Sequence, residues 1–103
     1  MADPMRIRAA LVGDLVDVKI LMAHDMETGL RKDSDGNTVP AHYIVSIGAT
    51  CNGRTVLSAQ WGPSVAKNPF LSFRFRNAKK GDKLSVTWTD TGGDTRTDEV
   101  AIR

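Results

Sequence analysis

Apolar and polar residues alternate along most of this chain, and hardly any stretch repeats at helical spacing. Strict alternation is typical of a strand that buries one face. Asn52-Gly53 is the strongest hairpin signal, because both residues tolerate positive φ. We expect seven short strands, whose inward-facing positions lie within residues 7–11, 16–22, 43–51, 55–61, 71–75, 84–88 and 100–102.

Seven short strands separated by turn signals predict an all-β fold, an immunoglobulin-like antiparallel β-sandwich of about seven strands. The Cys-Trp-Cys framework of antibody domains is absent, so the pattern supports only the architecture. We expect one domain over residues 1–103, with Trp88, Phe73 and Phe75 in its core. Truncating a buried Trp to Ala should cost ~3–5 kcal/mol, against a whole-domain stability of ~5–15 kcal/mol.

One segment, Ala23 to His42, is too long for a simple hairpin turn, and it holds both histidines, two glycines and a proline. Long loops on a rigid scaffold often carry function. Its Glu27 and Arg31 could pair locally, while His24 and His42 could cap strand ends. A pair of this kind on the surface contributes only ~0–1 kcal/mol. Our hypothesis is that the loop instead helps to form a protein-contact surface.

Composition limits the classes of function. The apolar content of 41% suits one packed core. The charges are interspersed and sum to only +2, which argues against a nucleic-acid partner. No apolar run approaches the ~20 residues that span a bilayer, and no signal peptide is visible at the N-terminus. Nucleophile elbows, phosphate loops and paired catalytic carboxylates are lacking, so the chain is not expected to be an enzyme or to need a cofactor.

Three groups of residues could carry chemistry of their own. Met22, His24, Met26 and His42 offer thioether and imidazole ligands of the kind that Cu(I) prefers. Residues 33–37 resemble a calcium loop, but the glycine comes too early and Ile44 stands where a glutamate should close the loop, so we expect a hairpin turn. The lone Cys51 could be a nucleophile, although a half-buried structural thiol is the more ordinary role.

Several large apolar residues fall where the strand pattern points outward. They are Leu21, Ile44 and Phe70, with Trp61 close to a loop. Three such residues on a small domain suggest a covered surface. A domain of this mass has about 5,700 Å² of accessible surface, of which a standard interface takes ~800 Å². We predict a partner interface that includes Leu21, His24, Glu27, Arg31, His42, Ile44, Trp61 and Phe70.

Motifs spread over nearly the whole chain resemble the SoxZ family. They are H-D-M-E-T-G-L-R at residues 24–31, V-P-A-H-Y at 39–43, Asn52-Gly53, W-G-P at 61–63, K-N-P-F at 67–70 and the segment from Trp88 to Asp94. Each motif alone is weak, but their combination in this order is specific.

The resemblance implies a non-catalytic subunit with an immunoglobulin-like sandwich that pairs with SoxY in thiosulfate oxidation. SoxY carries sulfur intermediates on a cysteine in a mobile glycine-rich arm, and other Sox enzymes of the bacterial periplasm dock on it transiently. Export together with SoxY would account for the missing signal peptide. The chain shows no glycine-rich cysteine arm, so we expect no sulfur attachment here. The alternative from another class is a stand-alone periplasmic copper-binding β-sandwich.

Overall fold

The computed structural model describes residues 3–103, which form seven strands and two sheets. The first sheet has the order β1-β2-β5 and the second the order β4-β3-β6-β7, and all pairings are antiparallel. The strands are β1 (Arg6–Val12), β2 (Leu15–Leu21), β3 (Ile44–Cys51), β4 (Arg54–Gln60), β5 (Phe70–Arg76), β6 (Lys83–Asp90) and β7 (Thr95–Ala101). The predicted seven-stranded β-sandwich is confirmed. Among these residues there is no helix long and apolar enough to cross a membrane.

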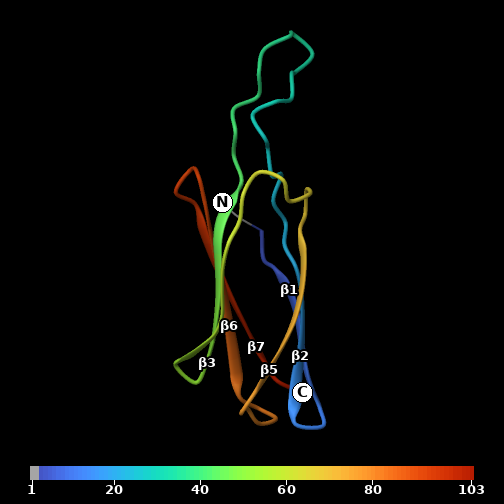
Figure 1. Ribbon diagram of the computed structural model, residues 1–103, viewed down its shortest axis with the longest axis vertical. Helices are drawn as coiled ribbons and strands as arrows, with labels where there is room; N and C mark the ends of the chain where they lie inside the picture. The colour runs from blue at the N-terminus through green and yellow to red at the C-terminus, as the bar shows by residue number, and fades with distance from the viewer. Residues whose placement is uncertain (1–2) are drawn as a thin grey trace.

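Short hairpins hold the register where the sequence places its turns. Gly13-Asp14 joins β1 to β2, Asn52-Gly53 joins β3 to β4, and residues 91–94 join β6 to β7. Asn52 and Gly53 have φ of 54° and 77°, as a two-residue type I′ turn requires. Three longer connections cross between the sheets, so each sheet mixes strands that are distant in sequence (Figure 1).

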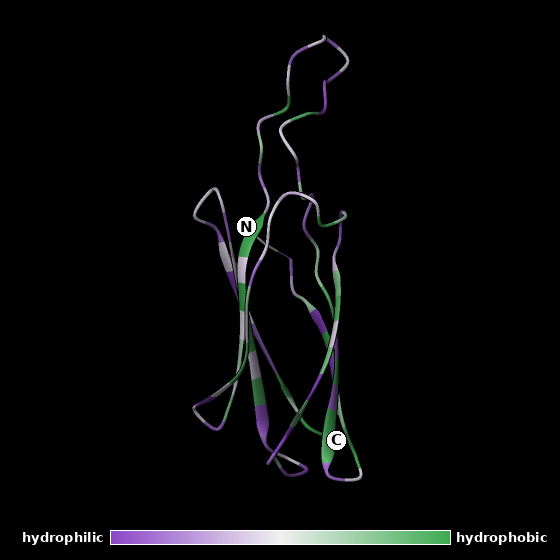
Figure 2. Cartoon of the chain, in the orientation of Figure 1, coloured by the Kyte–Doolittle hydropathy of each residue, from purple (hydrophilic) through white to green (hydrophobic). Residues whose placement is uncertain are grey.

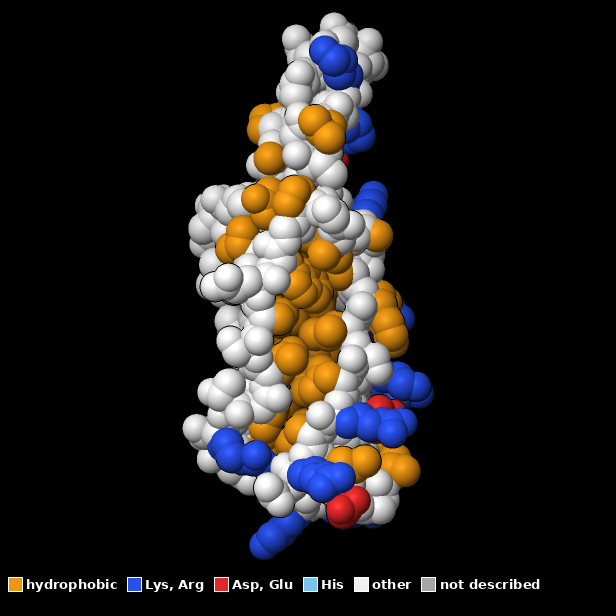
Figure 3. Space-filling view, viewed as in Figure 1, with side chains coloured by type: hydrophobic (Ala, Val, Ile, Leu, Met, Phe, Trp, Pro, Cys, Tyr) orange, Lys and Arg blue, Asp and Glu red, His pale blue; other side chains and the backbone are white. Residues whose placement is uncertain are grey.

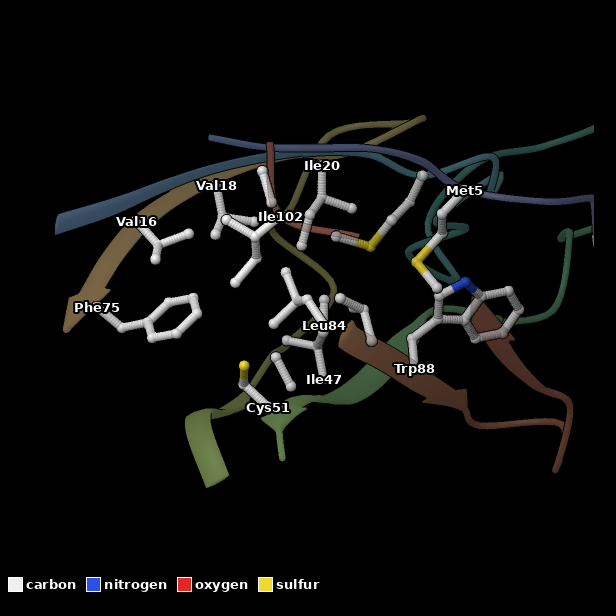
Figure 4. Close-up of a cluster of buried hydrophobic side chains, with 14 of the residues drawn as sticks. Met5, Val16, Val18, Ile20, Ile47, Cys51, Phe75, Leu84, Trp88 and Ile102 are labelled. Atoms are coloured by element: carbon white, nitrogen blue, oxygen red, sulfur yellow. The ribbon is translucent and has the colours of Figure 1, made fainter. Parts of the chain in front are cut away.

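The core lies between the two sheets and is almost wholly apolar. Val16, Val18 and Ile20 of one sheet face Ile47, Leu84 and Trp88 of the other (Figure 4). Trp88 and Phe75 are buried as predicted, whereas Phe73 is only partly buried. Cys51 is more deeply buried than expected, at 1% exposure, and its side chain points into the core.

Ile44 is not on the surface, contrary to the sequence prediction, and its side chain is fully buried. A β-bulge lies between Ile44 and Ser46 in the pairing of β3 with β6. A bulge adds one residue to a strand and reverses the alternation beyond it. Ile44 and Ile47 therefore share the inward face although they are three residues apart.

The segment between β2 and β3 projects beyond the sandwich as a long two-stranded finger, residues 22–43 (Figure 1). It accounts for the elongated shape, with extents of 53 × 21 × 20 Å. Its outer part is largely hydrophilic, whereas the strands alternate in hydropathy (Figure 2). The finger therefore cannot be held in place by a core of its own.

Candidate partner-binding surface

Three side chains meet where the finger joins the sandwich. His24 starts the outgoing arm, His42 ends the returning arm, and Asp90 is the last residue of β6. The Nε2 atoms of His24 and His42 lie 2.9 and 2.8 Å from the same oxygen of Asp90, Oδ2. The two rings are 5.0 Å apart, and the His24 ring also packs edge-on against Trp88. One buried carboxylate thus joins both arms of the finger to the second sheet.

Asp90 is held as an anion by several donors. Its second oxygen, Oδ1, accepts the backbone N–H groups of Gly92 and Asp94, at 3.0 and 2.9 Å. Burial raises the pKa of this carboxyl, but the hydrogen bond from His24, the backbone donors and the electrostatic interaction with His42 outweigh it, so the net pKa is lowered. A Cβ at Gly92 would lie 3.1 Å from Nε2 of His42, so a larger residue at this position would push against that ring.

The His24 ring is engaged on both nitrogens, which fixes its tautomer. Nδ1 accepts the backbone N–H of Met26 at 3.1 Å, so the proton of the neutral ring must sit on Nε2 and point to Asp90. The donor atoms of His24, His42 and Asp90 lie within 4.8 Å of one another, as in some metal sites. A metal on Nε2 of His24 would move the proton to Nδ1, directly against the Met26 N–H. The geometry therefore favours a structural cluster.

The candidate copper ligands Met22, His24 and Met26 do not lie on one face of an extended strand. β2 ends at Leu21, and Met26 has a positive φ of 54°, so residues 22–26 do not continue as a strand. Met22 is fully buried in the core. The Met26 sulfur accepts the backbone N–H of Ile44 at 3.4 Å. Both thioethers thus serve packing, which removes the basis for a Met-His copper set.

Backbone pairing runs along the finger to its tip. Glu27 and His42 exchange two hydrogen bonds, of 2.7 and 2.9 Å, and Arg31 accepts the N–H of Val39 at 2.8 Å. At the tip, Oδ1 of Asp33 accepts the N–H groups of Asp35 and Asn37, which confirms the predicted turn.

On the finger's surface, Glu27 and Arg31 form the local ion pair that the sequence allowed, with Nη2 to Oε1 at 2.8 Å. This pair lowers the pKa of the Glu27 carboxyl, chiefly through the hydrogen bond from Arg31. Leu30, by contrast, is 86% exposed and contributes nothing to the fold by burial. The finger thus offers both a charged and an apolar group to solvent.

The two sheets are closed along one side and open along the other. On the closed side, Arg103 exchanges backbone hydrogen bonds with Ala9 and Leu11 of β1. On the other side stand the edge strands β4 and β5. Arg54 reaches across one end of the opening, where its Nη2 donates to the Arg76 carbonyl at 2.7 Å.

Inward-facing apolar residues remain partly exposed along this open side. Leu57 and Ala59 pair with buried residues of β3, and Leu71 and Phe73 pair with buried residues of β2, so all four face the core. Figure 3 shows hydrophobic side chains in a continuous band along the long axis. We call the following set the apolar strip: Leu57, Ala59, Trp61, Val65, Leu71 and Phe73. A band of this kind is typical of a surface that a partner covers.

The predicted interface residues fall in four separate places. Glu27, Arg31 and His42 lie on the finger, with His24 buried at its base. Trp61 belongs to the apolar strip. Leu21 and Phe70 are exposed neighbours on the outer face of the first sheet, whereas Ile44 is in the core.

Sequence reasoning missed Asp90, Leu30 and most of the apolar strip. The aspartate directly before Thr91-Gly92-Gly93 was a signal for a turn-capping carboxylate. No local pattern could show that this aspartate meets two histidines from the connection between β2 and β3. The strip could not be foreseen because alternation does not distinguish an edge strand from a central one.

Comparison with known proteins identifies the family. The family model described as "Sulphur oxidation protein SoxZ" matches residues 5–101, nearly the whole chain. The chain belongs to the SoxZ family. Membership supports a role in sulfur oxidation, as the resemblance implied. No curated protein matches the sequence at a significant level.

Solved structures share the fold at low sequence identity. A hypothetical protein, PH1083, from Pyrococcus horikoshii OT3 has 21% identity and a TM-score of 0.65, over 99% of this chain and 89% of that one. A superoxide reductase in the oxidized state has 20% identity and a TM-score of 0.61, over 96% and 86% of the two chains. The superoxide reductase (neelaredoxin) from Archaeoglobus fulgidus has 18% identity and a TM-score of 0.57, over 95% of this chain and 84% of that one. At such identities the likeness concerns the fold alone.

Proposed function

We propose that this chain is the non-catalytic scaffold subunit of a sulfur-carrier complex, and that it pairs stably with SoxY in the periplasm. The observation that carries the proposal is the apolar strip, because a sandwich that leaves its own core open along one side is completed by another surface. Membership of the SoxZ family supplies the identity of the partner class. SoxY brings the cysteine arm, and this chain brings a rigid body.

The location of Cys51 supports the division of labour. Its thiol is in the core, and burial, followed by the charge of Asp82, raises its pKa. Only a thiolate is a competent nucleophile, so a buried thiol with a raised pKa is a poor carrier of sulfur. The sulfur intermediates therefore reside on the arm of SoxY, and other Sox enzymes meet that arm while this chain presents it.

The finger gives such a complex a second contact. It extends well beyond the sandwich, is fixed at its base by the buried Asp90 cluster, and carries an exposed Leu30. A projection with no core of its own is useful only where it meets another molecule. It contacts either SoxY or an enzyme that docks transiently on the complex.

The strip can be tested with single substitutions on its two edge strands. Leu57→Glu and Leu71→Glu each place a charge on a partly exposed edge position, from which it can reach water. Val12→Glu is the matched control, because Val12 is an exposed apolar residue at the end of β1, outside the strip. Affinity for SoxY is measured by calorimetry, and folding by thermal melting.

We expect the two strip variants to lose at least tenfold in affinity for SoxY, about 1.4 kcal/mol. Because both leucines pack against the core, each variant should also melt at a lower temperature than the wild type, so the affinity is measured well below that melting temperature. They should also self-associate less than the wild-type chain when expressed alone. The control should bind normally. Full affinity in both strip variants would exclude the strip as the SoxY interface.

The finger needs its own variant. Leu30→Ser changes a side chain that makes no buried contact, so melting should be unaffected. A loss of affinity for SoxY would show that the finger tip contacts SoxY. A lower rate of carrier processing at unchanged affinity would show that it contacts a docking enzyme. Wild-type values in both assays would show that the finger tip meets neither.

A further inference from the structure

Positive charge is concentrated on the outer face of the first sheet. The side chains that alternate outward on β1, β2 and β5 include five cations and one carboxylate, Asp17. We call this surface the basic face and define its cations as Arg6, Arg8, Lys19, Arg74 and Arg76. Its formal charge is +4, whereas the whole chain carries +2, so the rest of the molecule is net negative by 2. Charges that are interspersed in sequence are thus separated in space.

The arrangement does not serve the stability of the sheet. Arg8 lies directly opposite Lys19, and like charges in that position destabilise a strand pair. Asp17 pairs only with Arg74, at 3.4 Å between Oδ1 and Nε. Among residues 3–103, no carboxylate forms an ion pair with Arg6, Arg8 or Lys19. These cations are available to a partner.

An apolar pair borders the cations at one end of the sheet. Leu21 and Phe70 are paired across β2 and β5, and Arg6 lies opposite Leu21 on β1. Leu21 is 42% exposed and Phe70 62%. A shallow hollow of about 370 Å³ runs between these residues and Arg8, Lys19 and Arg103. Aromatic residues, including phenylalanine, and arginine are enriched at protein interfaces relative to the rest of the surface.

We propose that the basic face docks an acidic surface of a second protein, which places carboxylates against Arg6, Arg8 and Lys19 and an apolar side chain against Leu21 and Phe70. Exposed ion pairs contribute at most ~1 kcal/mol each, so a small free anion would bind weakly and several carboxylates must act together. Such contacts mainly accelerate encounter and are sensitive to salt. The exposed Leu21 and Phe70 favour a protein partner over a nucleic acid, whose contacts to a cationic face are mostly polar.

This surface is separate from the apolar strip. The cations point away from the core on the same sheet whose inner face borders the strip, so both surfaces can be occupied together. The inference therefore does not depend on the proposed pairing with SoxY. It predicts a second, transient partner that is acidic.

The test uses the full chain and a fluorescein-labelled peptide of alternating Asp and Glu with a central Leu-Phe pair. A second peptide replaces that pair by Ser-Ser, and a short duplex DNA is the third probe. Anisotropy is measured at low and at physiological ionic strength. Arg8→Glu is the principal variant, because the introduced carboxylate would face Lys19 across the strands as a favourable pair and so preserve the fold. Lys80→Glu makes the same change of charge at an exposed site outside the face.

We expect Arg8→Glu to weaken binding of the Leu-Phe peptide about tenfold at low ionic strength and to flatten its dependence on salt. Lys80→Glu should change the affinity less than twofold. Phe70→Ser should weaken the Leu-Phe peptide but not the Ser-Ser peptide. The proposal is overturned by equal losses in Arg8→Glu and Lys80→Glu, by no binding to the wild-type chain, or by tighter binding of the DNA with the same dependence on Arg8.

Discussion

Replacing Asp90 by Asn tests whether one buried carboxylate fixes the finger to the sandwich. The substitution keeps the size of the side chain and its Oδ1 acceptor, which can still receive the N–H groups of Gly92 and Asp94. The second oxygen becomes an NH2 group that faces the two histidines. His42 is half exposed and can turn an acceptor nitrogen to it. His24 cannot, because Met26 holds its Nδ1 as the acceptor.

The structure sets the size of the effect. In the variant, the buried Nε2–H of His24 would face the NH2 group of the amide, and an unsatisfied buried donor costs about 1–3 kcal/mol. The remaining hydrogen bonds would also be weaker, because their acceptor would no longer carry the negative charge of a carboxylate. Rotating the amide would be worse, because two backbone donors would then oppose the NH2 group. We expect Asp90→Asn to lower the free energy of unfolding by about 2–4 kcal/mol at neutral pH.

Urea unfolding followed by tryptophan fluorescence measures the change, since Trp88 packs against His24. Asp94→Asn is the matched control, because only the backbone of Asp94 contacts Asp90, and it should change stability by less than about 0.5 kcal/mol.

The pH dependence gives a second check on the same residue. The pKa of Asp90 is lowered in the folded state. Its contribution is therefore complete above its unfolded pKa of about 3.9 and is lost as pH falls through the lower folded value. The gap between wild type and Asp90→Asn should narrow below about pH 4. A variant as stable as the wild type at neutral pH, or a gap that does not respond to acid, would refute the reasoning.

Two further predictions concern the finger and the thiol. Gly29 has a φ of 86°, and a Cβ there would lie 3.1 Å from that of Ala41, so Gly29→Ala should loosen the finger by about 1 kcal/mol; amide hydrogen exchange should quicken in residues 27–42 and not in the core strands. Cys51 should resist thiol reagents in the native protein and react at once in urea, because its thiol is buried. Intact-mass analysis after thiosulfate turnover should find the adduct on SoxY alone, and an adduct on most copies of this chain would contradict the proposed role.

The sequence determined the local architecture of this protein. Alternation specified the strands, and Asn52-Gly53 and Asp33–Asn37 specified turns, because side-chain direction and positive φ are properties of a few neighbouring residues. The burial of Trp88 and Phe75 followed from the same pattern. The motifs of the SoxZ family could also be recognised from the sequence, since each lies within a short segment.

The tertiary structure alone decided where these elements meet. The bulge beside Ile44 depends on pairing with β6, so no count along β3 could reveal the burial of that residue. The meeting of His24, His42 and Asp90 joins residues up to 66 positions apart. The strip and the basic face both arise from strand order, which places β5 at an edge and gathers the outward cations of three strands on one surface. Pairing between distant strands depends on the whole chain, and this pairing creates each of the proposed surfaces.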